Sequence, residues 1–134
     1  MTLRTRRLIV AAPITELLAV LGMLVPGAML FESLDATTTA RMVEVQRLAL
    51  WTAPTAGFVF SVLGGWWVAR PASNAHERNG LALSVAVALI DLALLIASGA
   101  PFGVLFVSSL ASRIAGGYCG GVLAKRRARA VVGA

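Results

Sequence analysis

Residues 108–129 read SSLASRIAGGYCGGVLAKRRAR, and this stretch decides the fold. It is built of apolar and small residues over the length of a membrane crossing, and it ends in a basic cluster. Small residues recur at every fourth position, at Ser108, Ser112, Gly116, Gly120 and Ala124. Residues four apart share one helix face, and in lipid a face of small residues lets another backbone approach closely. The stretch therefore predicts a membrane helix that packs tightly against a second helix.

The composition of the 134-residue chain indicates a membrane protein. Hydrophobic residues make up 58% of the chain and charged residues only 13%, against roughly 25% charged residues in soluble domains. Four apolar segments are long enough to cross a hydrocarbon core of about 30 Å. They are residues 8–31, 48–69, 81–98 and 102–124, joined by an outer loop (32–47) and a cytoplasmic loop (70–80) and followed by a tail (125–134). We expect an all-α, integral membrane four-helix bundle that forms one transmembrane domain over residues 1–134.

The placement of the basic residues predicts the orientation of this bundle. Nine of the twelve Lys and Arg residues fall on one side of the predicted bundle: Arg4, Arg6, Arg7, Arg70, Arg78, Lys125, Arg126, Arg127 and Arg129. The positive-inside rule places both termini and residues 70–80 in the cytoplasm, as in a multi-pass protein of the bacterial inner membrane. The net charge of +6 thus follows from topology, and the expected partner is the lipid bilayer rather than nucleic acid.

The second segment carries the same ribbon of small residues as the fourth. The ribbon consists of Ala53, Gly57, Ser61, Gly65 and Ala69, and adding 55 to each number gives the ribbon of the fourth segment. The first and third segments match at an offset of 75, where Glu16 corresponds to Asp91 and Pro26 to Pro101. The two offsets favour two similar helical hairpins related by a parallel internal repeat. Chance similarity is the alternative, because small residues and prolines are common in membrane helices.

The small residues are the expected packing residues of the bundle. The central ones are Gly57, Ser61, Gly65, Ser112, Gly116 and Gly120. In the fourth segment Ser109, Gly117 and Gly121 form a second ribbon beside the first. Such ribbons predict packing inside the bundle or between subunits, in a homo-oligomer or a larger membrane complex, and the alternative is the lining of a narrow pore.

Three ionisable residues lie inside the apolar segments. At 1.5 Å per residue, Glu16, Asp91 and Arg113 lie about 14, 16 and 18 Å from the cytoplasmic ends of their segments, close to the midplane. A lone charge at that depth costs about 2.5 to 3.5 kcal/mol on insertion scales, so we expect Asp91 and Arg113, on adjacent helices, to form an ion pair. Glu16 then shares the same guanidinium or carries a proton. The cluster fixes helix register or serves proton-coupled transport.

Sequence motifs for catalysis or cofactor binding do not occur in the chain, so we expect no enzyme activity, no cofactor and no metal site. The single cysteine, Cys119, excludes an internal disulfide and a cysteine-based metal cluster. His76, followed by Glu77 and Arg78, is expected in a solvated loop.

The repeated glycine-rich endings resemble those of one known group. GGWWVAR at residues 64–70 and GGYCGGVLAKRR at residues 116–127 look like small four-span bacterial membrane proteins of unknown function, a resemblance that implies no activity. The size, the four spans and Glu16 in the first span are also similar to small multidrug resistance transporters. In that family the membrane glutamate exchanges protons for cationic drugs, whereas Asp91 and Arg113 have no counterpart there.

Two functions remain open on these observations. The ribbons and short loops favour a non-enzymatic interaction or assembly protein that works through helix packing. The intramembrane charges favour a small proton- or cation-coupled transporter or channel that uses Glu16, Asp91 and Arg113.

Overall fold

The protein consists of four α-helices in series, and a computed structural model describes residues 5–33, 38–72, 75–99 and 102–132. The helices are α1 (Thr5–Ser33), α2 (Thr38–Ala69), α3 (His76–Ser98) and α4 (Val104–Val132). These described residues contain no β-strand. The expected all-α class is therefore confirmed.

Three of the helices are long and apolar enough to cross a membrane, over Thr5–Met29, Val43–Ala69 and His76–Ser98. Large apolar side chains are exposed along them, as expected for surfaces that face lipid rather than water. The helix α4 has 29 residues, as many as α1, but Arg113 and its many serines and glycines lower its hydropathy below that of the other three. Three helices are therefore consistent with a membrane protein, and the crossing by α4 stays a prediction.

The helices extend beyond the predicted apolar segments. Within the predicted outer loop (32–47), α2 already begins at Thr38, and α3 begins at His76, inside the predicted loop 70–80. At the other end of the chain, α4 runs through most of the predicted tail, to Val132. The added turns of α2 and α4, residues 38–47 and 125–132, contain no Pro or Gly, so they can continue the helices past the apolar stretch.

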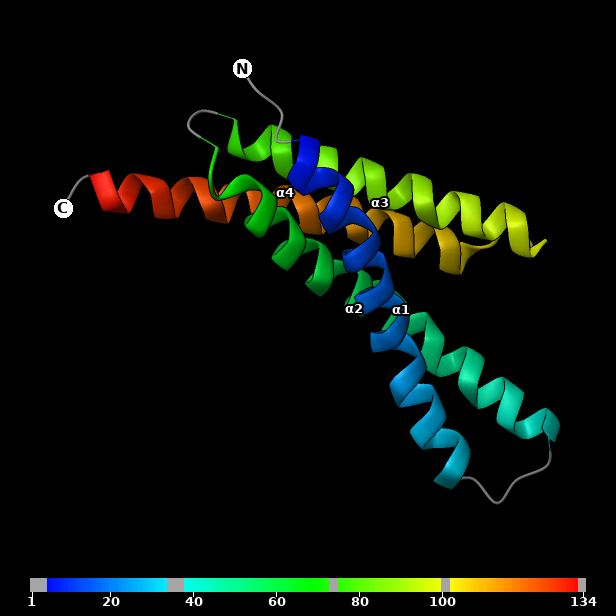
Figure 1. The fold of residues 1–134 in the computed structure, drawn as a ribbon. Coiled ribbons are helices and arrows are strands. Elements are labelled where there is room, and N and C mark those ends of the chain that lie inside the picture. The colour runs from blue at the N-terminus through cyan, green and yellow to red at the C-terminus, as the bar shows by residue number, and fades with distance from the viewer. Residues whose placement is uncertain (1–4, 34–37, 73–74, 100–101, 133–134) are drawn as a thin grey trace.

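The two helical hairpins diverge, so the bundle is V-shaped (Figure 1). The start of α1, the end of α2, the start of α3 and the C-terminal half of α4 lie together at one end, which we call the terminal end, and the last turns of α4 project past it (Figure 1). The opposite end, toward which the hairpins splay, is called the hairpin end. The buried apolar core consists of Ala11, Ala12, Val68, Leu83 and Val87. These residues lie in the terminal halves of their helices, except Val87, the middle residue of α3, so the bundle is closed there.

Polar contacts tie the helices together at the terminal end. The ring of His76 is buried, with its Nδ1 2.8 Å from the carbonyl oxygen of Ala69, so the expectation of a solvated loop histidine is wrong. The side chain of Lys125 donates to Glu77 at 2.9 Å and joins α4 to α3. The helix α3 stops at Gly99, whose φ of 65° forms a left-handed cap, and the Gly99 N–H donates to the carbonyl oxygen of Ile96 at 3.2 Å.

The ribbon residues of α4 lie directly against the backbone of α2. A Cβ atom added at Gly116 would lie 2.5 Å from the carbonyl oxygen of Phe58, and one added at Gly65 would lie 2.8 Å from the carbonyl oxygen of Gly117. Both helices run from the hairpin end to the terminal end, so they pack parallel (Figure 1). Only glycine permits so close an approach of two backbones.

The second ribbon of α4 packs against α3. A Cβ atom added at Gly121 would lie 2.8 Å from the Cα of Glu77, and one added at Gly80 would lie 3.0 Å from the Cα of Gly121. The helix α4 therefore lies between α2 and α3 with both of its small-residue ribbons engaged inside the chain. This fixed position determines where Arg113 points.

Candidate functional site

Arg113 is buried in the middle of the bundle, with 5% of the residue exposed. Its stem passes Gly57 of α2, where an added Cβ would lie 3.3 Å from the Arg113 Cγ and 3.4 Å from its Nη1. A side chain at position 57 would compete for this space. The ribbon glycine therefore leaves room for the guanidinium group as well as for helix packing.

The guanidinium group of Arg113 binds Glu16 of α1 with two hydrogen bonds. Its Nε donates to Glu16 Oε2 at 3.1 Å, and its Nη2 donates to Glu16 Oε1 at 2.9 Å. The carboxylate is buried, with 3% of the residue exposed. Among the described residues, no Cα atom of α1 lies within 8 Å of a Cα atom of α4. The ion pair thus bridges two helices whose backbones stay apart, which requires the full length of the arginine side chain.

Asp91 of α3 forms an ion pair with the third nitrogen, Nη1, of the same guanidinium group. Arg113 Nη1 lies 3.1 Å from Asp91 Oδ2, but the geometry is that of an ion pair and not of a hydrogen bond, because the buried Oδ2 accepts none in the described structure. Arg113 Nη1 donates instead to the hydroxyl oxygen of Ser109, one turn earlier in α4. Asp91 is therefore the carboxylate with unused hydrogen-bonding capacity.

The structure brings together all three of the charges predicted to lie near the midplane. The expected ion pair of Asp91 with Arg113 is present, at 3.1 Å, and Glu16 shares the same guanidinium group, which is one of its two expected states. In the structure Glu16 makes the two-bond pair, and Asp91 makes the looser contact. Helix order and depth predict which residues are neighbours. They do not predict how the guanidinium group is shared between the two carboxylates, which depends on the packing of the side chains.

Two residues that support the charges were expected only as packing residues. Ser109 holds Nη1 of Arg113 from the preceding turn, and Gly57 leaves space for its stem. A third, Ser84 of α3, donates from its Oγ to the backbone carbonyl oxygen of Arg113 at 3.0 Å. The spacing of four residues between Ser109 and Arg113 was the signal in the sequence for the first of these contacts.

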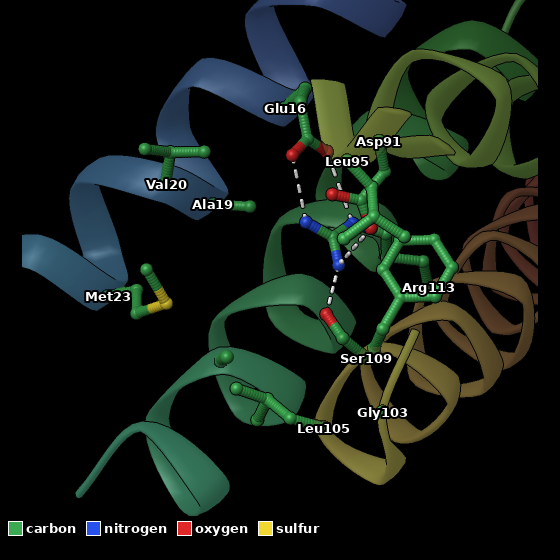
Figure 2. Close-up of a pocket in the computed structure, with 12 residues that line it drawn as sticks. Glu16, Ala19, Val20, Met23, Asp91, Leu95, Gly103, Leu105, Ser109 and Arg113 are labelled. Carbon is green, nitrogen blue, oxygen red and sulfur yellow. Dashed lines mark hydrogen bonds and ion pairs between the residues drawn. The ribbon is translucent and has the colours of Figure 1, made fainter. Parts of the chain in front are cut away.

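A cavity of about 340 Å³ lies beside the three charges, on the hairpin side of them. Its wall combines apolar side chains of all four helices with the carboxylates and the guanidinium group. Figure 2 shows Val20 and Met23 of α1 on one side of the cavity and Leu95 and Leu105 on the other. With both carboxylates ionised, Glu16, Asp91 and Arg113 carry one net negative charge. The cavity is thus lined mainly by apolar side chains, with a small polar region of net negative charge formed by Glu16, Asp91 and Arg113.

Metal binding at the described residues finds no support, because no three His, Cys, Asp or Glu side chains among them cluster so as to hold an ion. A second cavity of about 310 Å³ between α1 and α2 is lined by Met23, Leu24, Gly27, Ala28, Val45, Leu48, Ala49 and Thr52. This second lining carries no ionisable side chain. The charged cavity is therefore the stronger candidate site.

Comparisons with family models, curated proteins and solved structures found no match to this chain.

Proposed function

We propose that the protein is a small proton- or cation-coupled transporter that uses the charged cavity, with Asp91 as the carboxylate that exchanges its bound cation. The observation that carries the proposal is the buried Asp91 Oδ2, which accepts no hydrogen bond among the described residues and belongs to a residue that lines the cavity. A buried carboxylate oxygen that has an ion-pair contact but accepts no hydrogen bond is incompletely satisfied, and a proton or a small cation would satisfy it.

The charge of the cluster supports binding of a positive species. Arg113 compensates one of the two carboxylates, so one negative charge remains when both are ionised. The bidentate pair with Glu16 uses two of the three nitrogens of the guanidinium group and has the geometry of a strong, fixed interaction. Glu16 therefore acts as the structural partner, and Asp91 as the exchangeable one.

The closed terminal end supports a one-sided site. Buried apolar residues such as Val68 and Leu83 fill the terminal halves of the helices, while the cavity lies on the hairpin side of the charges. A transporter must expose its site to one side at a time, and intramembrane ionisable residues facing a cavity are the usual mark of such a pathway. Under this proposal the site is accessible from the hairpin end.

The separation of α1 from α4 supports a moving part. The described backbones of these two helices are held together across the cavity by the side chains of Glu16 and Arg113 rather than by direct packing. A proton or cation bound to Asp91 would cancel its negative charge and weaken its attraction for the guanidinium group, so the guanidinium group would shift toward Glu16. We propose that α1 responds to this shift, because its carboxylate follows the arginine.

The proposal includes the finer topology. The charge distribution supports crossing of the bacterial inner membrane by all four helices with both termini in the cytoplasm, so that the hairpin end faces outward.

The proposal also includes a parallel repeat of the two hairpins. In support, residues related by the offset of 55 lie opposite each other. A Cβ atom added at Gly57 would lie 3.3 Å from Ser112 Oγ, and one added at Gly116 would lie 3.0 Å from Ser61 Cβ. Contacts between equivalent residues are what a two-fold axis between α2 and α4 would produce.

The assembly role expected from the ribbons has less support. The packing residues Gly65, Gly116 and Gly120 face other helices of the same chain. Their small faces are therefore not free to hold a neighbouring subunit. An oligomer or a complex with another membrane protein would use the larger apolar side chains that remain exposed.

Flux measurements in reconstituted vesicles test the transport proposal. We expect a pH gradient to drive movement of protons, alkali cations or lipophilic cations in the wild type, detected with pH-sensitive and cation-sensitive dyes. Asp91→Asn should abolish this coupled flux, because the amide cannot exchange a cation. Glu44→Gln is the matched control, since Glu44 is an exposed carboxylate that pairs only with Arg47 at 3.7 Å among the described residues. Absence of flux for the whole panel, or full flux in Asp91→Asn, would refute the proposal.

A further inference from the structure

Two arginines from different helices converge on one indole ring at the terminal end. The Cζ atom of Arg70, just after α2, lies 5.4 Å from the centroid of the Trp66 ring, and the Cζ atom of Arg127, in α4, lies 5.7 Å from it. Both distances are within the range of a cation–π contact. The packing of α4 on α2 thus concentrates two positive charges at one aromatic side chain.

Neither guanidinium group is neutralised by the protein where the structure is described. No described carboxylate lies within 4.0 Å of Arg70 or Arg127, and Glu77, the acidic residue of this end, is paired with Lys125 at 2.9 Å. Both arginines are exposed. Two like charges held at one ring repel each other, and an anion that contacts both would remove this repulsion.

The position of the ring indicates which anion is available. Trp66 is half-buried at the end of the span Val43–Ala69, and its neighbour Trp67 lies under another arginine, with the Cζ of Arg7 5.2 Å from its ring centroid. Tryptophans at the ends of membrane spans sit at the level of the lipid headgroups, where their apolar ring meets the acyl region. Phosphate groups of lipids lie at this same level.

We propose that Arg70, Trp66 and Arg127 form a binding site for the headgroup phosphate of an anionic phospholipid. The two guanidinium groups hold the phosphate from two helices, and the indole ring contacts the glycerol region beneath it. A zwitterionic lipid also carries a phosphate, but its amine would be repelled by the same two arginines. The site therefore selects anionic lipid and links the ends of α2 and α4, independently of the charged cavity.

Native mass spectrometry of the full chain tests this site. The protein in mild detergent would be titrated with phosphatidylglycerol or with phosphatidylcholine, and the lipid-bound fraction measured. We expect the wild type to prefer phosphatidylglycerol. The double variant Arg70→Gln and Arg127→Gln should bind it roughly tenfold or more weakly than the double variant Arg126→Gln and Arg129→Gln, which removes the same charge from other exposed positions.

A second variant keeps the test decisive if the first double variant does not fold. Trp66→Leu retains every charge and removes only the ring, so it should weaken phosphatidylglycerol binding while the net charge is unchanged. Equal losses in the two double variants would mean that only overall charge attracts the lipid, and this result would overturn the proposal. Equal binding of phosphatidylglycerol and phosphatidylcholine by the wild type would overturn it as well.

Discussion

A single arginine organises the centre of this bundle. Arg113 binds Glu16 through two nitrogens, contacts Asp91 through the third and is steadied by Ser109. Lysine would not replace it, because a point charge on a shorter group cannot span from α4 to α1 and form two parallel hydrogen bonds. The clustering of the three charges was predictable from sequence. The relative strength of the two ion pairs was not, because it depends on how the arginine side chain packs.

The rank of the two carboxylates gives the first prediction. Arg113→Ala should destabilise the protein by about 3 to 5 kcal/mol, because it leaves buried carboxylates without a counter-charge. Adding Glu16→Gln should restore stability by about 1 to 3 kcal/mol, and adding Asp91→Asn should restore less, because Glu16 forms the closer pair. Thermal unfolding of the single and double variants in one detergent measures both couplings.

Additive effects in both double variants would argue against an arginine-centred cluster. A larger coupling for Asp91 than for Glu16 would contradict the assignment of Glu16 as the structural partner. Arg113→Lys is a further control, since it retains the charge and should still lose stability.

At the scale of the helices, small residues determine which elements pack together. One ribbon of α4 meets α2 and the other meets α3, so α4 has backbone contacts on two sides. The sequence was sufficient to predict that α2 and α4 pack tightly. It was not sufficient to predict that both ribbons are used within one chain, because packing within a subunit and between subunits requires the same residues.

The backbone contact at Gly116 leads to a second prediction. Gly116→Ala should destabilise the bundle by about 1 to 3 kcal/mol, since its Cβ would lie 2.5 Å from the carbonyl oxygen of Phe58, an atom that cannot move without its helix. Gly27→Ala is the matched control. It lies inside α1 with nothing within 4 Å of its added Cβ, so it should be neutral or gain up to about 1 kcal/mol from helix propensity. Unfolding midpoints of the two variants compare them, and equal midpoints would show that α2 and α4 are not in close contact at Gly116.

At the scale of the whole molecule, the V shape separates a packed half from an open half. The terminal half holds the apolar core and the polar contacts of His76 and Lys125, and the hairpin half holds the cavity. Composition and hydropathy predicted the helices and their order. The divergence of the hairpins was not predictable, since hydropathy does not specify the angle at which helices pack. Hydropathy likewise does not predict the burial of His76, which depends on where α3 meets the end of α2.

The weak hydropathy of α4 has a consequence for how the protein enters its membrane. The helix α4 is synthesised after α1, α2 and α3, and it carries an arginine that disfavours insertion by about 2.5 to 3.5 kcal/mol. Both carboxylates that receive this arginine are earlier in the chain, on α1 and α3, so they are already present when α4 leaves the ribosome. We expect the first three helices to act as the receptor for insertion of the fourth.

The third prediction, that insertion of α4 depends on Glu16 and Asp91, can be measured by glycosylation mapping of a site placed after Val132. In the wild type the tail should remain on the side where it was made, with α4 inserted and this site unmodified. In the double variant Glu16→Leu and Asp91→Leu, α4 should fail to insert, and the site should be modified in a substantial fraction of chains. Glu44→Leu, which alters an exposed acid, should behave as the wild type. Normal insertion in the double variant would mean that α4 enters the bilayer on its own, whatever its partners.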